Sequence, residues 1–227
     1  LKFLKDKTLS NYKIKKDIEV IPNFIDTTKY HRLNKKENCT CSKRLAPNKE
    51  KILIHTSNFR PVKRVQDVIQ IFAKVKAKIP ARLILIGDGP ERSDCERLCR
   101  ELNIFDSVKF MGKQDSLIEL LSIADLFLIP SQTESFGLAA LEAMSCEVPV
   151  ISTSVGGLPE LNIHNETGYI AEIGDVDRMA KYAIELLSNG KKYTIFSKNA
   201  RERAKDFDEN KIVPIYEAFY EKILRGK

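Results

Sequence analysis

From residue 51 onward, short apolar runs alternate with amphipathic stretches, and this alternation constrains the fold more than any other feature. The apolar runs predict buried strands at residues 51–55, 81–86, 108–111, 126–129, 148–152 and 169–172. Between the first two runs, residues 65–78 carry apolar side chains at helical spacing: Val65, Val68, Ile69, Phe72 and Val75. Strands buried on both faces and joined by helices form a parallel sheet, so we predict an α/β fold with a doubly wound, Rossmann-like sheet.

The remaining segments are predicted to be mainly helical. Helices are expected at residues 91–103, 117–124 and 137–146, and three more fill the chain after Asp175, at residues 175–189, 193–206 and 209–224. The first 50 residues differ from the rest. There we expect a helix over residues 1–11 and a short strand over Ile18–Ile21, which Pro22 and Asn23 end.

The net charge of +7 is concentrated at the start of the chain, where residues 1–50 hold 13 Lys and Arg against 6 Asp and Glu. This segment lacks the interleaved aromatic residues of a single-strand binder and every helix-turn-helix or RNA-binding signature. It is interpreted as a solvated face or an inter-domain contact, with no nucleic-acid partner. No apolar run reaches the roughly 18 residues that span a bilayer, and residues 1–7 do not have the pattern of a signal peptide. A cytoplasmic protein without membrane association is expected.

Cysteines and histidines offer neither a metal site nor a nucleophile. The five cysteines have no metal-ligand or disulfide-framework spacing and indicate a reduced protein: Cys39, Cys41, Cys95, Cys99 and Cys146. His31 and His164 lie in expected surface segments, and His55 ends a strand, where a satisfied core histidine is commoner than a base.

Residues 131–144 carry the most informative pattern, because they follow the strand 126–129 and open a helix near Gly137. Free amides and the helix dipole attract an anion there, and Gly137 would let a ligand approach the main chain. Glu134 and Glu142 flank that position, and carboxylates accept hydrogen bonds from sugar hydroxyls. The pattern indicates a ligand with a phosphate centre and hydroxylated ends. The alternative is that Glu134 caps the helix and Glu142 is a solvated residue.

A second loop, residues 56–64, follows the first strand and holds Arg60, Lys63 and Arg64. Cations at the carboxyl end of a buried strand can neutralise a diphosphate, although a basic helix start on the surface has the same pattern. The loop Gly87-Asp88-Gly89-Pro90 lacks the third glycine of a dinucleotide site and predicts a tight turn at the edge of the ligand cleft.

Taken together, these loops resemble the family 4 retaining glycosyltransferases. Glu134 and Glu142 match the family's two glutamates, and the resemblance extends from about Ile18 to Leu187 through 87–91, 134–137, 156–160 and 167–169. Residues 51–68 and 110–115 are most similar to the branch that acts in bacillithiol biosynthesis. That resemblance implies transfer of N-acetylglucosamine from UDP-N-acetylglucosamine to L-malate, with retention of configuration and without a cofactor or metal.

The resemblance also implies the role of each site residue. Lys63 and Asn58, with the main chain of Phe136, Gly137 and Leu138, would hold the diphosphate, and Ser135 would belong to the same nucleotide-sugar-binding loop. Glu142 would bind the ribose, Glu134 the transferred sugar, and the loop Lys113-Gln114 the uracil. Lys63 and Glu134 are the expected catalytic residues. Asn58 stands where most relatives have a diphosphate-binding arginine, and Arg60 is the candidate to replace that charge.

The chain resembles the C-terminal half of a two-domain glycosyltransferase fold. Residues 1–17 are interpreted as a remnant of the N-terminal acceptor domain or a linker, 18–205 as the nucleotide-sugar-binding domain, and 206–227 as a helix that packs back on the missing domain. We expect such a chain to bind UDP or UDP-N-acetylglucosamine without turnover. Open alternatives are a family 4 transferase with a lipid or polysaccharide acceptor, a non-catalytic nucleotide-sugar-binding module, and a homo-oligomer.

Overall fold

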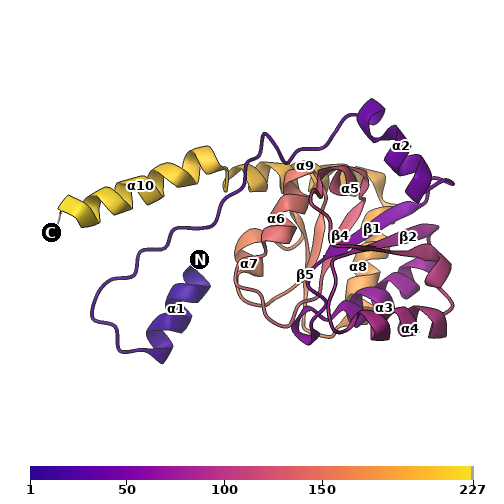
Figure 1. Ribbon diagram of the computed structural model, residues 1–227, viewed down its shortest axis with the longest axis horizontal. Helices are drawn as coiled ribbons and strands as arrows, with labels where there is room; N and C mark the ends of the chain where they lie inside the picture. Colours follow the sequence, from indigo (N-terminus) through magenta and orange to yellow (C-terminus); the bar gives the residue numbers. More distant parts are fainter. Residues whose placement is uncertain (226–227) are drawn as a thin grey trace.

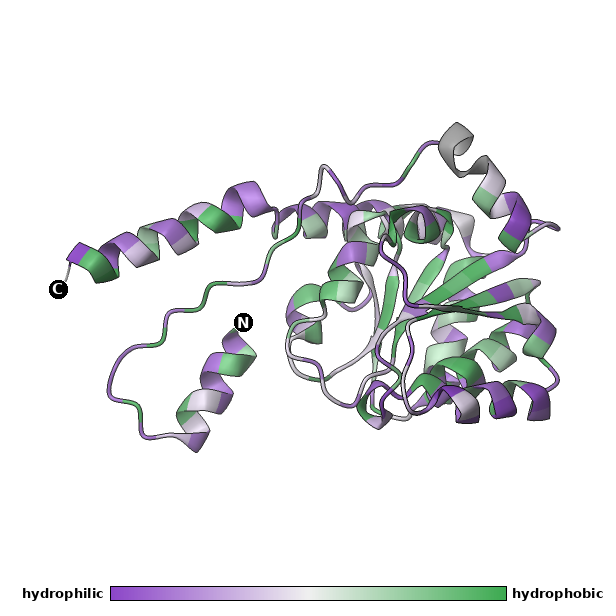
Figure 2. Ribbon diagram, viewed as in Figure 1, coloured by the Kyte–Doolittle hydropathy of each residue, from purple (hydrophilic) through white to green (hydrophobic). Residues whose placement is uncertain are grey.

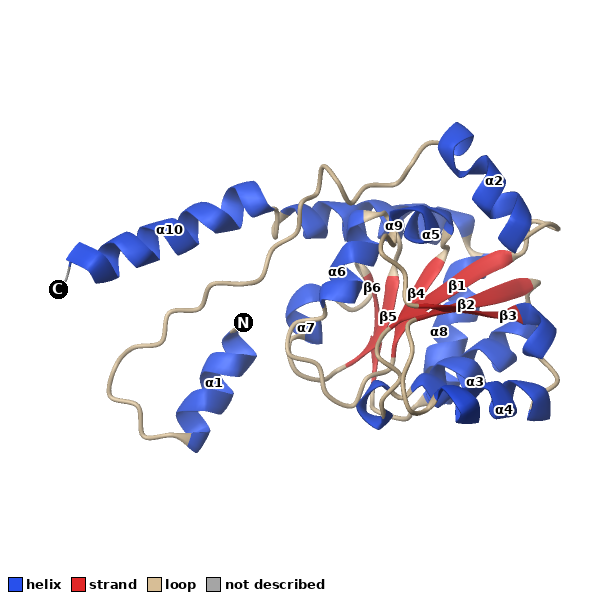
Figure 3. Cartoon of the chain, viewed as in Figure 1, coloured by secondary structure: helices blue, strands red, loops and turns tan. Residues whose placement is uncertain are grey.

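The computed structural model describes residues 1–225, and within residues 35–39 only the backbone. One six-stranded parallel sheet forms the centre of the molecule, in the order β3-β2-β1-β4-β5-β6 (Figure 3). Its strands are β1 (Lys51–Thr56), β2 (Ala81–Ile86), β3 (Val108–Gly112), β4 (Leu126–Ile129), β5 (Val150–Thr153) and β6 (Gly168–Ala171). This order is that of a Rossmann fold. The predicted doubly wound α/β fold is therefore confirmed.

Helices cover both faces of the sheet (Figure 1). One face packs against α3 (Val65–Lys76), α4 (Arg92–Glu101) and α8 (Val176–Ser188). The other packs against α2 (Lys35–Leu45), α5 (Ile118–Ile123), α6 (Leu138–Ser145), α7 (Leu158–Leu161) and α9 (Gly190–Lys205). Two 3₁₀ turns, Pro61–Lys63 and Phe105–Ser107, complete the connections. The polar segment that forms α2 carries no clear apolar spacing, and this helix was not predicted.

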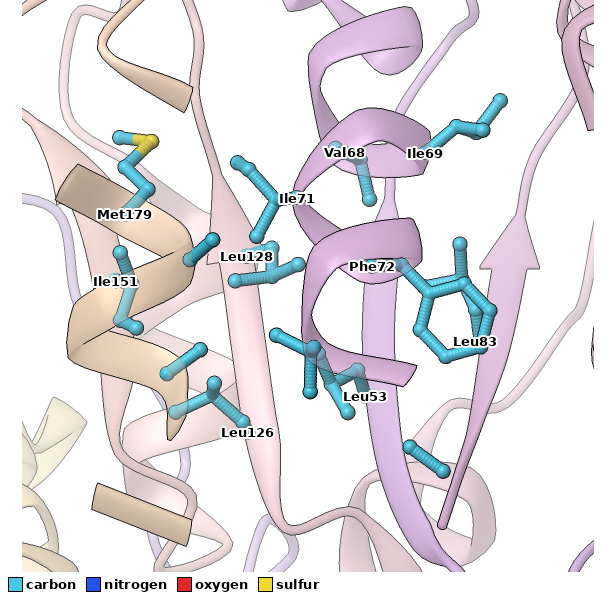
Figure 4. Close-up of a cluster of buried hydrophobic side chains, with 14 of the residues drawn as sticks. Leu53, Val68, Ile69, Ile71, Phe72, Leu83, Leu126, Leu128, Ile151 and Met179 are labelled. Carbon is cyan, nitrogen blue, oxygen red and sulfur yellow. The ribbon is translucent and has the colours of Figure 1, made fainter. Parts of the chain in front are cut away.

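Apolar side chains pack together between α3, α8 and the sheet (Figure 4). All five α3 residues predicted for the buried face are fully buried, and they meet strand residues such as Leu53 and Leu128. The strands are correspondingly hydrophobic along their length (Figure 2). Burying one such side chain contributes about 1.5–3 kcal/mol, so this layer holds the strand ends, and the loops that follow them, in fixed positions.

The two ends of the chain extend away from this body (Figure 1). They comprise α1 (Lys2–Asn11), an extended segment, and α10 (Glu209–Arg225), where the Tyr216 hydroxyl donates a hydrogen bond to the carbonyl of Pro22 at 3.4 Å. The strand predicted at Ile18–Ile21 is wrong: this segment has no strand partner, and an isolated bridge joins Ile25 to Asp208 instead. The assignment of residues 1–17 to another domain or a linker, and of residues 206–227 to a helix that packs on that domain, stays a prediction. In the described part of the chain, no helix is long and apolar enough to cross a membrane.

Candidate active site at the carboxyl edge of the sheet

The order of the strands places a crevice between β1 and β4. The chain proceeds from β1 to β2 on one side and from β4 to β5 on the other, so the loops that leave these two neighbours diverge. Ligands of doubly wound sheets bind in the crevice that such a reversal opens at the carboxyl ends of the strands. The two loops that the sequence singled out, 56–64 and 131–137, are the loops that leave β1 and β4.

A cavity of about 380 Å³ occupies this position. Its lining combines polar, charged and apolar side chains: His55, Thr56, Ser57, Asn58, Lys63, Leu117, Ile129, Ser131, Glu134, Gly137, Leu138, Ala139 and Glu142. Two other cavities, of about 530 and 630 Å³, border the amino ends of the strands beside α2, away from these loops. The carboxyl-edge cavity is the candidate site because it unites the predicted cation, the two predicted carboxylates and a helix start.

Lys63 and Glu134 face each other across this cavity. The Lys63 Nζ donates a hydrogen bond to Glu134 Oε2 at 2.6 Å, and both side chains are largely shielded from solvent, with 22% and 15% of their surface exposed. The 3₁₀ turn Pro61–Lys63 places the lysine, and the loop after β4 places the glutamate. Glu134 therefore does not cap α6. A ligand that carried both an anionic group and hydroxyls could separate this pair, because its anionic group could bind Lys63 and a hydroxyl could bind Glu134.

Glu142 lies one and a half turns into α6, half-buried in the same cavity. Burial raises the pKa of this carboxyl, and a hydrogen bond with the Tyr30 side chain partly offsets the rise. Tyr30 is fixed through its own carbonyl, which accepts hydrogen bonds from Ser145 Oγ at 2.6 Å and from Arg201 at 2.9 Å. The alternative that Glu142 is a solvated residue is wrong. A carboxylate in this position can accept further hydrogen bonds from hydroxyl groups.

The start of α6 contributes backbone amides to the cavity. Gly137 is the residue before the helix, with φ of 95°, and Leu138 begins it. The amides of a first helical turn have no intrahelical acceptor and carry the positive end of the dipole. The glycine is required by its left-handed backbone and by contact with Leu158, which a Cβ would approach to 2.8 Å. A Cβ on Gly137 would therefore face Leu158, while the residue also lines the cavity, and close approach of a ligand to its main chain stays a prediction.

His55 lines the cavity, and its imidazole ring is neutral. Its Nδ1–H donates to the Leu128 carbonyl at 2.8 Å, so Nε2 accepts from the Ser57 hydroxyl, also at 2.8 Å. Burial lowers the pKa of His55 to about 4, and the charge of Lys63 adds to this effect. The expectation of a satisfied core histidine is confirmed.

Five predicted site residues lie outside the cavity lining. Arg60, Lys113 and Gln114 are exposed, and the Gln114 amide donates to Met111 O and Lys113 O in its own loop. Ser135 is exposed, and the Phe136 ring is buried against Phe207, so Phe136 could meet a ligand through its main chain alone. Arg64, the third cation of its loop, is bound to Asp67 at 2.6 Å.

Turns after neighbouring strands support the two site loops. Asp88 in the glycine-rich turn after β2 accepts a hydrogen bond from Phe59 N at 3.0 Å, and Gly157 N donates to Glu134 O at 3.2 Å. Glu160 lies in α7, just after the turn that follows β5. Its carboxylate accepts hydrogen bonds from the backbone amides of Lys2 and Phe3 at the start of α1. The prediction of a tight turn at residues 87–90 is confirmed, and Glu160 has a structural role.

Sequence reasoning missed several residues of the cavity. Ser57 and Ser131 lie inside the loops that it singled out, so their position after a strand was an available signal. Tyr30 reaches Glu142 from a segment more than a hundred residues away, and nothing in the sequence pattern indicated that contact.

No cluster of three or more potential metal ligands occurs among the described residues. Cys95, Cys99 and Cys146 are buried free thiols, with pKa values raised by burial to about 12, 11 and 12. The Cys39 side chain lies outside the described residues. Independence from metal stays a prediction.

Comparison with known proteins places these features in context. Residues 40–203 match the family described as "Glycosyl transferases group 1". The chain is 47% identical over 212 residues to N-acetyl-alpha-D-glucosaminyl L-malate synthase of Bacillus anthracis, covering 92% of this chain and 55% of that protein.

Solved structures agree with the sequence comparison. Sucrose-phosphate synthase from Thermosynechococcus elongatus superposes with a TM-score of 0.86 at 26% identity, over 98% of this chain and 57% of that one. Anabaena Alr3699/HepE in complex with UDP and glucose superposes with a TM-score of 0.81 at 25% identity, over 91% and 57%. The chain thus spans about half the length of the relatives that it matches.

Proposed function

Because the chain belongs to the group 1 glycosyl transferases, we propose that it is the donor-binding part of a retaining transferase that moves N-acetylglucosamine from UDP-N-acetylglucosamine to L-malate. The family fixes the class of reaction. The donor and acceptor are taken from the name of the relative in Bacillus anthracis, and the UDP-bound Anabaena protein supports a uridine nucleotide as ligand.

One observation carries the proposal: Lys63, Glu134, Glu142 and the start of α6 border a single cavity. A diphosphate needs positive charge and N–H donors, and Lys63 with the amides after Gly137 offers both. The hydroxyls of the ribose and of the transferred sugar need hydrogen-bond acceptors, which Glu142 and Glu134 offer, respectively. No other cavity described above has this combination.

The same groups would act on the departing nucleotide. As the bond from the sugar to the diphosphate breaks, negative charge grows on the phosphate oxygen. Lys63, once released from Glu134, and the dipole of α6 would stabilise that charge, which would lower the barrier without a protein nucleophile. Glu134 would hold the sugar, so that the acceptor hydroxyl attacks the face from which the diphosphate leaves.

The Lys63–Glu134 ion pair must open when the donor binds. A phosphate oxygen would replace the glutamate on Lys63, and a sugar hydroxyl would then occupy Glu134. A ligand without the sugar leaves Glu134 unpaired beside an anion, which is unfavourable. We therefore expect the intact sugar nucleotide to offset the loss of the pair more fully than UDP does.

Calorimetric titration of the chain with UDP, UDP-N-acetylglucosamine and GDP-mannose tests the proposal. Binding of both uridine ligands, with weaker binding of GDP-mannose, is expected. Lys63→Ala removes a charge-assisted contact of about 1.5–3 kcal/mol, so UDP affinity should fall roughly 10- to 100-fold. Glu142→Ala should weaken UDP but leave inorganic pyrophosphate unaffected, because Glu142 is assigned to the ribose.

Lys74→Ala is the matched control, since Lys74 is also an ion-paired lysine, bound to Asp177 at 2.8 Å on the outer side of α3. It should bind UDP as the unaltered chain does. Equal UDP affinity in the Lys63→Ala and Lys74→Ala proteins would remove the basis of the assignment.

A further inference from the structure

Ser131 is completely buried, yet its hydroxyl has no hydrogen-bond partner. It is the second residue after β4 and three residues before Glu134, and it lines the carboxyl-edge cavity. A buried hydroxyl without a partner loses its hydrogen bonds to water and gains nothing in return, which costs about 1–3 kcal/mol. Such an atom in a native structure calls for an explanation.

Other buried serines show that the fold normally satisfies this group. Ser122, Ser145 and Ser197 donate to backbone carbonyls, and Ser152 accepts from the side chain of Asn162. Among the described residues, the other buried side-chain atom without a partner is the Tyr193 hydroxyl, which does not line this cavity. Ser131 therefore combines two properties: an unsatisfied donor and a place in the candidate site.

The position of Ser131 is fixed by its backbone. Its carbonyl accepts a hydrogen bond from Thr153 Oγ1 at 2.6 Å, and the next amide, of Gln132, donates to Val62 O at 2.8 Å. These bonds tie the loop after β4 to β5 on one side and to the Lys63 turn on the other. The hydroxyl is thus held at the junction of the two loops that would enclose a diphosphate.

We propose that Ser131 is a donor-binding residue whose hydroxyl donates a hydrogen bond to a non-bridging oxygen of the nucleotide diphosphate. The inference rests on the proposed function. The partner of Ser131 is inferred to be the phosphate rather than the sugar, because phosphate oxygens only accept hydrogen bonds. Ser131 also shares its cavity with Lys63 and the α6 amides, which are donors too. The ligand hydroxyls are already matched by Glu134 and Glu142.

The hydroxyl is closed to solvent in the ligand-free protein, so a lining side chain must move before a phosphate can reach it. The Lys63–Glu134 pair lines the same cavity, and a diphosphate would separate it. Binding would then separate the ion pair and give the Ser131 hydroxyl a hydrogen-bond acceptor in one step. The serine would therefore have a partner only in the ligand-bound protein.

The variant Ser131→Ala tests this assignment through two measurements on the full chain, thermal unfolding and calorimetric titration. Because the hydroxyl has no partner in the free protein, its removal should leave the melting temperature unchanged or higher. Affinity for UDP and for inorganic pyrophosphate should fall about tenfold, the usual effect of losing one hydrogen bond to a charged group.

Ser197→Ala is the matched control. Ser197 is also buried, but its hydroxyl donates to Glu147 O at 2.7 Å and lies outside the cavity. This variant should melt at a lower temperature and bind UDP normally. The two serine variants are thus expected to show opposite effects on stability and on binding.

Two outcomes would overturn the inference about Ser131 and leave the proposed function intact: unchanged UDP affinity in Ser131→Ala, or a melting temperature lowered as far as in Ser197→Ala. Failure of the unaltered chain to bind either UDP or UDP-N-acetylglucosamine would instead refute the proposed function, and the serine's assignment with it.

Discussion

At the scale of single residues, His55 shows how the site restricts protonation. The ring is buried, Nδ1–H is committed to the Leu128 carbonyl, and Nε2 accepts from Ser57. A proton on Nε2 would break the second bond and place a positive charge beside Lys63. The folded state therefore favours the neutral ring, in keeping with the lowered pKa of about 4.

This histidine should make the protein less stable in mild acid. Above pH 6.5 the ring is neutral in both states and adds no pH dependence. Between pH 6.5 and 4, His55 binds a proton in the unfolded chain but stays neutral in the folded chain. The free energy of unfolding therefore falls as the pH drops. From pH 7 to 4.5 this amounts to about 2.5 kcal/mol.

The variant His55→Asn keeps a donor toward Leu128 but does not titrate. Denaturant unfolding from pH 4.5 to 8 should show that the variant loses less stability in acid than the unaltered chain, by roughly that amount. His164→Asn is the control, because this histidine is exposed. Parallel pH profiles for the unaltered chain and His55→Asn would contradict the assignment of a buried neutral ring.

How much of the site was predictable also differs from residue to residue. Lys63, Glu134 and Glu142 were predictable because each lies in or just after a loop that follows a strand. Arg60 was predicted from its charge, and its side chain is exposed and outside the cavity lining, so its role stays a prediction. Tyr30 was not predictable, since only the packed fold brings it to α6.

At the scale of elements, the strands were predictable because a strand buried on both faces must be continuously apolar. The failure at Ile18–Ile21 has the same physical basis. A short, mostly apolar run suits a strand, but a strand also needs a neighbour, and this segment runs beside α10 rather than along the sheet. Helix α2 was missed because its residues are mostly polar, so no apolar periodicity marks it.

The turn after β5 shows how one element positions another. Gly156 has φ of 58°, and a Cβ at this position would overlap the carbonyl oxygen of Glu134. Gly156→Ala should therefore push the Glu134 loop away from the turn. We expect a destabilisation of about 1–3 kcal/mol, together with a measurable loss of UDP affinity.

Gly190→Ala is the contrasting substitution. Gly190 begins α9, has an ordinary backbone conformation and leaves open space for a Cβ. The alanine should raise stability by about 0.4–1 kcal/mol and leave UDP binding unchanged. Denaturant unfolding and titration of both variants check the pair. A Gly156→Ala protein as stable as Gly190→Ala would show that the turn does not support the Glu134 loop.

At the scale of the whole molecule, α1 is joined to the body through Glu160 and through the packing of Leu1 against the core. The helix has no buried residue, and its first two amides donate to the two carboxylate oxygens at 3.0 and 2.8 Å. A carboxylate at a helix start contributes about 0.5–2 kcal/mol. Because no residue of the helix is buried, this contact should strongly affect how often α1 separates from α7.

Glu160→Ala should release α1 without unfolding the sheet. Trypsin cleavage at Lys5 and Lys7 should become about tenfold faster, while the melting temperature of the body changes little. Glu166→Ala is the control, because Glu166 is an exposed glutamate on the next turn. Equal cleavage rates in the two variants would mean that packing, rather than Glu160, retains the helix.

The remaining question at this scale is whether the chain can complete a reaction. Sugar transfer requires the acceptor hydroxyl to be held about 3–3.5 Å from the anomeric carbon, which calls for groups on both sides of the donor. Every group assigned above serves the nucleotide or the transferred sugar, and the chain spans 55% of its Bacillus anthracis relative. We therefore predict that the 227-residue chain binds UDP but transfers no N-acetylglucosamine to L-malate. Mass spectrometry of a mixture with UDP-N-acetylglucosamine and L-malate checks this. Product formed at the rate of the Bacillus anthracis enzyme would place the acceptor site within this domain.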